Sequence, residues 1–293
     1  MTLLLCLGDL NLDVTITLED SLAVGSDTSG RIEVHGGGSA ANVAVWAARN
    51  GADVSFVGVV GDDQAADYLH EELSNSGVQV TTLRRAGTRT RAVAAIVDAA
   101  GERSLVSDLG TTLYPAVEDF DREWLAGVGW LHLTGYTFIA EYSRPFFRMI
   151  TAEAVRRGIP FSVDPSAAHL LQAEFEPGEV LAALDGAAVV FPNRDEAEFL
   201  TGIADPGEAA TSLLRVAETA VEKCGPDGAW IARRGLEPMC VAAAETDFVS
   251  TLGAGDAFAG GFLAGTVRGL DARATAQLAA ETAAHAVARS PAR

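Results

Sequence analysis

The run Gly253-Ala254-Gly255-Asp256 is the part of the sequence whose residue types could most clearly do chemistry. It precedes a small, apolar helical pattern that continues from Ala257, so it predicts a tight turn that opens a helix. The first N–H groups of a helix lack partners and carry partial positive charge, which favours an anion such as a phosphate. Asp256 stands beside that position, where its carboxylate could take a proton from an attacking hydroxyl. These features suit phosphoryl transfer to an alcohol. The alternative is that Asp256 only caps the helix and the glycines only serve packing.

A second group of polar residues follows the first predicted strand, residues 3–7. In open α/β sheets, ligands bind at the carboxyl ends of the strands. Asn11 and Asp13 alternate with leucines, so we expect their side chains to point the same way and to hold vicinal hydroxyls of a sugar. An ordinary polar turn is the alternative. Gly37 and Gly38 then precede a helix that ends at residue 49; they let the backbone approach a ligand, and Asn42 could add a hydrogen bond.

Two further polar sites lie in the second half of the chain. Asn193 and Glu196 are three residues apart at a helix start, so they can face one way and hold Mg²⁺ through its waters. A simple stabilising effect of the acidic residue on the first helical turn is the alternative. Lys223, Gly225 and Gly228 belong to a Lys-x-Gly-x-x-Gly turn that precedes another strand.

These sites are spaced along a regular alternation of strands and helices, which predicts a single α/β domain over residues 1–293. Two β excursions interrupt the alternation, at about 14–35 and 88–108, and we expect them to form one β-lid that excludes water. The predicted helices are 64–76, 144–157, 256–268 and 273–288, and the predicted strands of the main sheet are 3–7, 54–60, 78–83, 130–133, 160–163, 189–191, 229–232 and 248–249.

Composition excludes several classes of protein. The chain carries 40 acidic against 21 basic residues, a formal net charge of −19, so we expect no broad binding to nucleic acid or to an anionic membrane. No apolar run approaches the length of a membrane span, and the amino terminus lacks the basic region of a signal peptide. Three scattered cysteines, without a Cys-x-x-Cys pair, argue against a disulfide framework or a zinc site and favour the cytoplasm.

The order of these motifs resembles that of the ribokinase-like (PfkB-type) carbohydrate kinases over essentially the whole length. Both signatures of the family are recognisable, at residues 36–44 and 250–258. The resemblance implies a three-layer αβα core with a mostly parallel central sheet and a small β-sheet lid. It also implies ATP and Mg²⁺ as co-substrates, with transfer of the γ-phosphate to a hydroxymethyl group of a small sugar or nucleoside.

Carried over by position, the resemblance assigns a role to each motif. Asp256 is similar to the catalytic base, and the N–H groups of Gly253, Ala254 and Gly255 to the anion hole. The sugar site corresponds to Asn11, Asp13, Gly37, Gly38 and Asn42. Asn193 and Glu196 match the Mg²⁺-phosphate motif, and the turn of Lys223, Gly225 and Gly228 matches the nucleotide side.

Two departures from the family pattern limit what carries over. The family usually has Asp-Thr-Thr before Gly-Ala-Gly-Asp, but this chain has Ser250-Thr251-Leu252, so we expect at most a weak monovalent-cation site. Gly37-Gly38-Ser39 replaces the Gly-Gly-Lys of true ribokinases, which argues against ribose and leaves fructose, 2-keto-3-deoxygluconate and nucleosides open. A nucleoside kinase is the nearest alternative, and a non-catalytic sugar-binding protein is a more distant one. A lid with unpaired strand edges predicts a homodimer.

Overall fold

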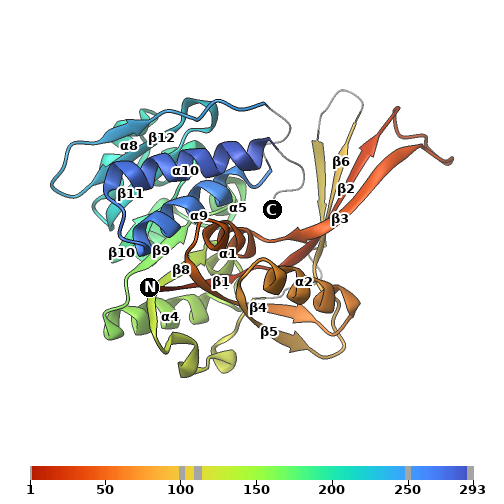
Figure 1. Ribbon diagram of the computed structural model, residues 1–293, viewed down its shortest axis with the longest axis horizontal. Helices are drawn as coiled ribbons and strands as arrows, with labels where there is room; N and C mark the ends of the chain where they lie inside the picture. Colours follow the sequence, from red (N-terminus) through yellow and green to blue (C-terminus); the bar gives the residue numbers. More distant parts are fainter. Residues whose placement is uncertain (1, 99–102, 109–113, 248–251, 289–293) are drawn as a thin grey trace.

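The computed structural model describes residues 2–98, 103–108, 114–247 and 252–288, and its strands form two sheets (Figure 1). The larger sheet has the strand order β13-β12-β11-β10-β9-β8-β1-β4-β5, and it is parallel from β11 to β5. β12 and β13 add antiparallel strands at one edge. Its strands are β1 (Leu3–Gly8), β4 (Asp53–Gly61), β5 (Gln79–Arg85), β8 (Val128–Thr134), β9 (Phe161–Asp164), β10 (Ala187–Val190), β11 (Ala217–Lys223), β12 (Ala229–Arg233) and β13 (Met239–Val241).

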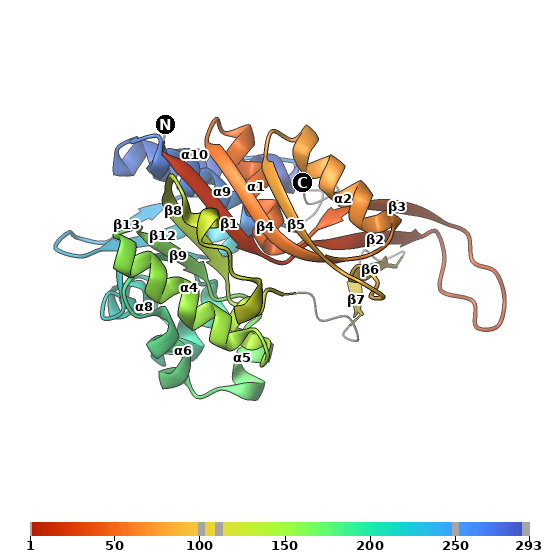
Figure 2. The same cartoon turned by 90° about the horizontal axis from the view of Figure 1, so that it is seen from below.

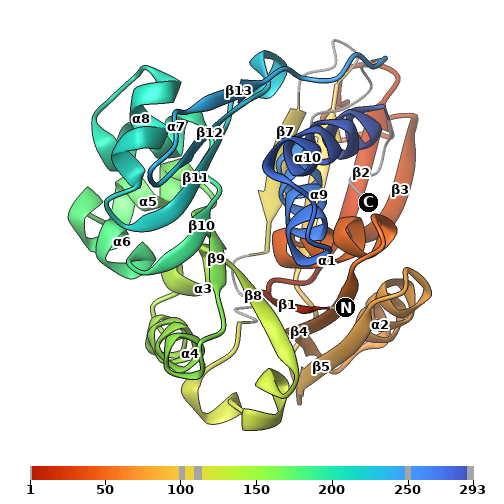
Figure 3. The same ribbon diagram turned by 60° about the vertical axis from the view of Figure 1, so that its left-hand side comes forward.

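Helices cover both faces of the large sheet, which gives the three layers that the sequence predicts (Figure 3). β1 shows why, because Leu4 and Cys6 pack on one face while Leu5 and Leu7 pack on the other. The first face carries α1 (Ser39–Arg49), α2 (Gln64–Asn75), α9 (Ala254–Val267) and α10 (Ala272–Val287). The second carries α3 (Tyr136–Ile139), α4 (Arg144–Arg157), α5 (Ala168–Glu174), α6 (Pro177–Leu184), α7 (Arg194–Thr201) and α8 (Pro206–Leu213).

The two predicted β excursions form a single second sheet. Its order is β3-β2-β6-β7, with β2 parallel to β6 and the two outer pairs antiparallel. The strands are β2 (Asn11–Leu18), β3 (Gly30–Gly37), β6 (Ala92–Val97) and β7 (Arg103–Ser107). In Figures 1 and 2 this sheet stands beside the layered core and projects away from it. It therefore borders the core from one side, at the end where β1 continues toward β2.

Small residues bring α9 close to its neighbours. A Cβ atom added to Gly260 would lie 2.7 Å from the Trp46 side chain of α1, and one added to Gly261 would lie 2.6 Å from the Thr282 hydroxyl of α10. Such distances are shorter than van der Waals contact, so only glycine fits at these positions. The close packing fixes the amino-terminal end of α9, where Asp256 lies, against α1.

Some predicted elements need correction. The strand β11 was not predicted, and Lys223 ends that strand rather than belonging wholly to a turn. The short edge strand β13 and the helices α3, α5, α6 and α8 were also not predicted as elements, whereas α7 begins where Asn193 and Glu196 predicted a helix start. α9 begins at Ala254, so only Gly253 of the predicted turn precedes the helix. The predicted strand at 248–249 and the Ser250 position lie outside the described residues. None of the described helices combines the length and apolar character that a membrane span requires.

Candidate active site

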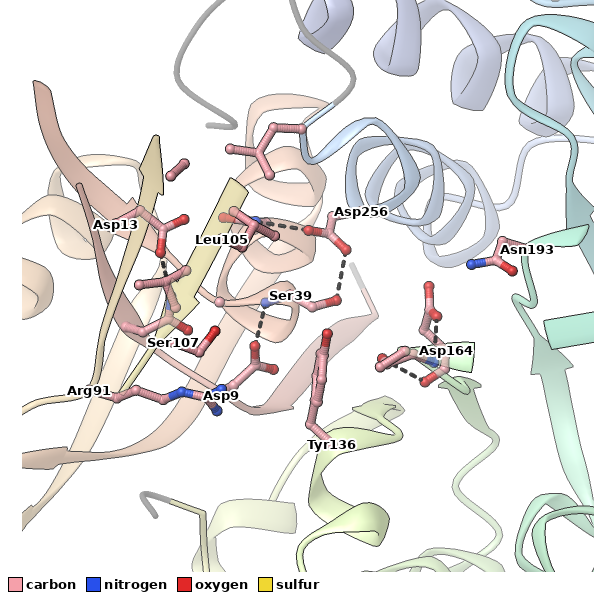
Figure 4. Close-up of a pocket in the computed structure, with 18 of the residues that line it drawn as sticks. Asp9, Asp13, Ser39, Arg91, Leu105, Ser107, Tyr136, Asp164, Asn193 and Asp256 are labelled. Carbon is pink, nitrogen blue, oxygen red and sulfur yellow. Dashed lines mark hydrogen bonds between the residues drawn. The ribbon is translucent and has the colours of Figure 1, made fainter. Parts of the chain in front are cut away.

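A cleft between the core and the second sheet collects most of the predicted site residues (Figure 4). Its volume is about 320 Å³, within the range of about 300–1,000 Å³ that is usual for small-molecule sites. Figure 4 shows Asp256 between Asp13 and Arg91 on one side and Asp164 and Asn193 on the other. The predicted residues that line the cleft are Asn11, Asp13, Gly38, Asn42, Asn193, Glu196, Lys223 and Asp256.

Asp256 lies in the first turn of α9, with its carboxylate held by two side chains of α1. The Ser39 hydroxyl donates to Oδ1 at 2.7 Å, and the Asn42 amide donates to Oδ2 at 2.8 Å. Among the residues that the structure describes, no side-chain capping hydrogen bond is found at the amino terminus of α9, so Asp256 does not act as its cap. Burial and the nearby Asp164 charge raise the pKa of Asp256 to about 7, against the lowering effect of the Asn42 and Ser39 hydrogen bonds. A carboxylate with such a pKa can exchange a proton near neutral pH.

The backbone at the start of α9 has the form that an anion-binding turn requires. Gly253 has a φ of 73°, a left-handed conformation that favours glycine, and the first helical hydrogen bond runs from the Ala257 N–H to its carbonyl. The N–H groups of Ala254 and Gly255 precede that bond and have no acceptor within the helix. A Cβ on Gly255 would lie 3.4 Å from the Lys223 ammonium nitrogen, so this turn and Lys223 face each other.

The residues predicted to bind a sugar are brought together at the base of the second sheet. Asn11 donates a side-chain hydrogen bond to the Asp13 carboxylate, and Asn11 is paired with Gly37 in the sheet. A Cβ on Gly37 would lie 2.2 Å from the Asp13 carboxyl carbon, and one on Gly38 would lie 2.4 Å from the Asp9 carbonyl oxygen. Gly38 is therefore required by its close approach to backbone and by its φ of 102°, whereas a side chain at Gly37 would displace the Asp13 carboxylate. Asn42 Oδ1 is buried and has no partner among the described residues.

Asn193 and Glu196 bind each other at the start of α7. The Asn193 side chain accepts from the Glu196 N–H at 2.9 Å, and the Glu196 carboxylate accepts from the Asn193 N–H at 2.8 Å. This is a capping box, so the pair stabilises the helix start, as the alternative interpretation expected, and it also faces the cleft. Burial and the charge of Asp164 raise the pKa of Glu196 to about 7.

Lys223 extends from the end of β11 into the cleft and forms an ion pair with Asp164, which ends β9. Burial acts to lower the pKa of Lys223, but the charges of Asp164 and Glu196 outweigh it and hold that pKa above its ordinary value. Gly225 and Gly228 lie in the short 3₁₀ turn after this strand and do not line the cleft. Only the lysine of that motif therefore reaches the cleft.

The structure adds polar residues that were not among the predicted site residues. Asp9 is buried and accepts hydrogen bonds from the Ser39 N–H at 2.6 Å, the Ala40 N–H at 3.2 Å and the Thr134 hydroxyl at 2.9 Å. It thereby ties the end of β1 to α1 and to β8. The other lining residues of this kind are Thr15, Ser39, Arg91, Ser107, Tyr136, Asp164 and Ser166. Asp9 and Asp164 each follow or end a predicted strand, and that position was the available signal.

The loop after β9 carries backbone strain next to the cleft. Ser166 and Ala167 have φ angles of 57° and 47°, in the left-handed region that costs about 1–3 kcal/mol for such residues. The Asp164 carboxylate accepts from the Ser166 N–H at 3.2 Å and holds the loop in this form. Strained residues persist where the surroundings fix them, which is common at binding sites.

Comparisons with known proteins show which family this chain matches. The model of the pfkB family of carbohydrate kinases matches residues 1–293. A fructokinase from Klebsiella pneumoniae is 31% identical over 247 residues, which cover 82% of this chain and 79% of that protein. An ATP-dependent ribose-1-phosphate kinase from Halopiger xanaduensis is 31% identical over 271 residues, covering 90% of this chain and 84% of that one.

Solved structures show the same fold. An adenosine kinase from Sinorhizobium meliloti has a TM-score of 0.86 at 23% identity, with 100% of this chain and 95% of that chain covered. A ribokinase from Thermotoga maritima has a TM-score of 0.80 at 21% identity, with 100% and 94% covered. The ribokinase-like fold predicted from the sequence is therefore confirmed, and the chain belongs to the pfkB family of carbohydrate kinases, whose members are kinases that use ATP.

Proposed function

We propose that this protein transfers the γ-phosphate of ATP to a hydroxymethyl group of a small carbohydrate, with Asp256 as the general base. The observation that carries the proposal is the Asp256 carboxylate, which is held by Ser39 and Asn42 at the centre of the cleft. The sheet of β2, β3, β6 and β7 would act as a lid that excludes water, which a kinase needs in order to avoid hydrolysing ATP.

The proposed reaction is a direct displacement at the γ-phosphorus. The acceptor oxygen forms the new P–O bond, its proton passes to Asp256, and the bond to the departing ADP oxygen breaks. The N–H groups at Gly253, Ala254 and Gly255 would stabilise the negative charge on the transferring group. Asn11, Asp13 and Asn42, with the backbone at Gly37 and Gly38, would position the sugar hydroxyls.

The nucleotide would lie on the side of Lys223. Its ammonium group could contact a phosphate oxygen, and the turn that contains Gly225 and Gly228 would lie behind it. Within the described part of the chain, no cluster of three or more His, Cys, Asp or Glu side chains could hold a metal ion directly. The mutual hydrogen bonds of Asn193 and Glu196 leave further lone pairs on their oxygens, which fits contact to Mg²⁺ through water. Mg²⁺ bound there would neutralise phosphate charge.

A nucleoside kinase is the second candidate, and the likeness to the adenosine kinase fold supports keeping it. Thermal-shift screening of sugars and nucleosides with ATP and Mg²⁺, followed by ADP release for each hit, separates the two.

We also propose a cytoplasmic location, supported by ATP as phosphoryl donor and by the exposed free thiol of Cys240. The exposed side chains of Ile32 and Val34 on β3 support a homodimer through the lid.

The variant Asp256→Asn tests the assignment of the base. We expect a normally folded protein that binds ATP and loses phosphoryl transfer by about 10²–10⁴-fold, the usual contribution of a positioned base. Asp67→Asn is the matched control, because Asp67 also lies in the first turn of a helix, α2, but away from the cleft. Near-normal ADP release by Asp256→Asn would show that another group takes the proton.

A further inference from the structure

Arg91 lies at the junction between the lid and the core, with its guanidinium group in the acceptor half of the cleft (Figure 4). It precedes β6, and its backbone carbonyl accepts from the Leu12 N–H of β2 at 2.9 Å. Alternation along β6 puts Arg91 on the same face as Val93 and Ala95, which also line the cleft. Ser107 of β7 is paired with Val93 and contributes a hydroxyl to the same wall.

The guanidinium group is anchored by a hydrogen bond. Burial acts to lower the pKa of Arg91, but neighbouring groups, Tyr114 and Asp9 among them, hold that pKa above its ordinary value. Arg91 Nη1 donates to the Tyr114 hydroxyl at 2.7 Å, and Tyr114 is itself buried. Arg91 Nε is buried and has no hydrogen-bond partner among the described residues, and no ion pair of Arg91 is found there either. The hydrogen bond to Tyr114 is the one that the Arg91 side chain makes among the described residues, so a ligand that supplies an acceptor to its Nη2 group gains a charge-assisted contact.

The nearby Asp9 carboxylate does not accept a hydrogen bond from Arg91. Both oxygens of Asp9 already accept hydrogen bonds, from the Ser39 and Ala40 N–H groups and from the Thr134 hydroxyl. Among the described residues that line the cleft, the other basic side chain is Lys223, which is paired with Asp164 on the nucleotide side. Arg91 is thus the cation that the acceptor meets.

We propose that Arg91, with the Ser107 hydroxyl beside it, forms an anion subsite that selects acceptors carrying a carboxylate or a phosphate ester over neutral sugars and nucleosides. The planar guanidinium fork matches both kinds of anion, because each offers two oxygens in one plane to adjacent N–H donors. The subsite rests on the proposed function, since it defines which carbohydrate that reaction takes.

Two pairs of acceptors test the subsite. 2-Keto-3-deoxygluconate is compared with fructose, and ribose 1-phosphate with methyl riboside, so that each pair contrasts an anionic with a neutral compound. ADP release gives kcat/KM for each, and calorimetry without ATP gives acceptor binding. We expect the wild type to favour at least one anionic member by about 10- to 100-fold, the range of a charge-assisted contact.

Variants assign that preference to the arginine. In Arg91→Gln we expect kcat/KM for the anionic acceptor to fall by about 10- to 100-fold, mainly through KM, while the neutral partner changes by less than about threefold. Arg91→Lys should recover part of the loss, because it keeps the charge without the fork. Arg89→Gln is the control: Arg89 is two residues away and carries the same charge, but its side chain is 80% exposed and pairs with Asp108.

Three results would overturn the subsite. They are a wild type that uses the neutral member of both pairs at least as well, an equal loss for both members in Arg91→Gln, and a wild type that binds neither anionic compound. If Arg91→Gln fails to fold, the acceptor preference of the wild type and its change in Arg91→Lys still test the subsite. ADP release by the wild type with neutral acceptors alone would refute the subsite and leave the proposed kinase intact. Absence of ADP release with every sugar would instead refute the proposed function, and acceptor binding would then decide the subsite.

Discussion

Replacing Ser39 by alanine should move the pH dependence of the reaction without removing the base. The Ser39 hydroxyl donates to Asp256 Oδ1 at 2.7 Å, and this bond favours the ionised carboxylate. A hydrogen bond to a charged group contributes about 1.5–3 kcal/mol, and one pKa unit corresponds to about 1.36 kcal/mol. Removing the bond should therefore raise the pKa of Asp256 by about 1–2 units above its value of about 7.

The sign of the effect follows from the role of a base. Asp256 must be ionised to accept a proton, so activity is lost as the pH falls through its pKa. At pH 7 the ionised fraction in Ser39→Ala should be about 5- to 50-fold lower than in the wild type, and kcat/KM should fall by the same factor. Near pH 9.5 most of the loss should disappear, since the carboxylate is then ionised in both proteins.

The assay measures kcat/KM for the acceptor between pH 5.5 and pH 9.5, with ADP release as the readout. Ser39→Thr should restore the profile because it keeps the hydroxyl. Ser76→Ala is the control, since the Ser76 hydroxyl donates to the Glu72 carbonyl at the end of α2. Glu196 also has a pKa of about 7. If the acid side of the kcat/KM profile keeps its midpoint near pH 7 in Ser39→Ala, the titration belongs to Glu196 and the reasoning about Asp256 is refuted. A loss that is equal at every pH would refute it as well.

Three further predictions address binding, ions and stability. Asp13→Ala should raise KM for the acceptor by about tenfold or more and leave ATP binding without sugar nearly unchanged; loss of ATP affinity with an unchanged KM would mean that the two halves of the cleft are reversed. Because Ser250 replaces the usual aspartate, exchanging a bulky organic cation for K⁺ should change the rate only weakly, and a many-fold rise would show that other groups complete a cation site. Burial raises the pKa of Glu222 to about 7, so ionisation of this 1% exposed side chain weakens the fold as the pH rises from about 4.5 through 7. Glu222→Gln should therefore raise the melting temperature at pH 8 and not at pH 5, while the exposed Glu198→Gln should do neither; equal shifts at both pH values would contradict this sign.

Elements with a clear period were predictable from the sequence, and β11 shows where this fails. Its sequence, Ala217–Lys223, includes two glutamates and no long apolar run. Glu222 is nevertheless buried opposite Trp230 of β12, because the edge of the sheet is covered by α8. Residues 217–223 form a strand because of their tertiary surroundings, and the hydrophobic pattern of the sequence does not reveal this. The same limit applies to β13, which has only three residues.

The site was predictable where one short motif carries both the residue type and the backbone geometry. Gly253 and Asp256 are three residues apart, and their positions follow from the helix that they begin. The partners of Asp256 were not predictable, because Ser39 is 217 positions away and Asn42 is 214 positions away. Which strand ends meet depends on the strand order, and that order places β1 between β8 and β4. For this reason Asp9 was not predicted as a site residue, although the sequence places it directly after the strand β1.

If ATP binds beside Lys223 as proposed, the pairing of Lys223 with Asp164 would explain how a strongly acidic cleft accepts a nucleotide. The described lining residues include five carboxylates, Asp9, Asp13, Asp164, Glu196 and Asp256, against the two cations Arg91 and Lys223. An ammonium group has three N–H donors, and Asp164 accepts from Lys223 through one oxygen, Oδ2. Asp164 can therefore keep Lys223 charged and directed into the cleft while its remaining donors stay available to a phosphate. Removing Asp164 would leave the charge but lose its direction. We therefore expect this aspartate to position the lysine, and its place at the end of a predicted strand was the sequence signal for it.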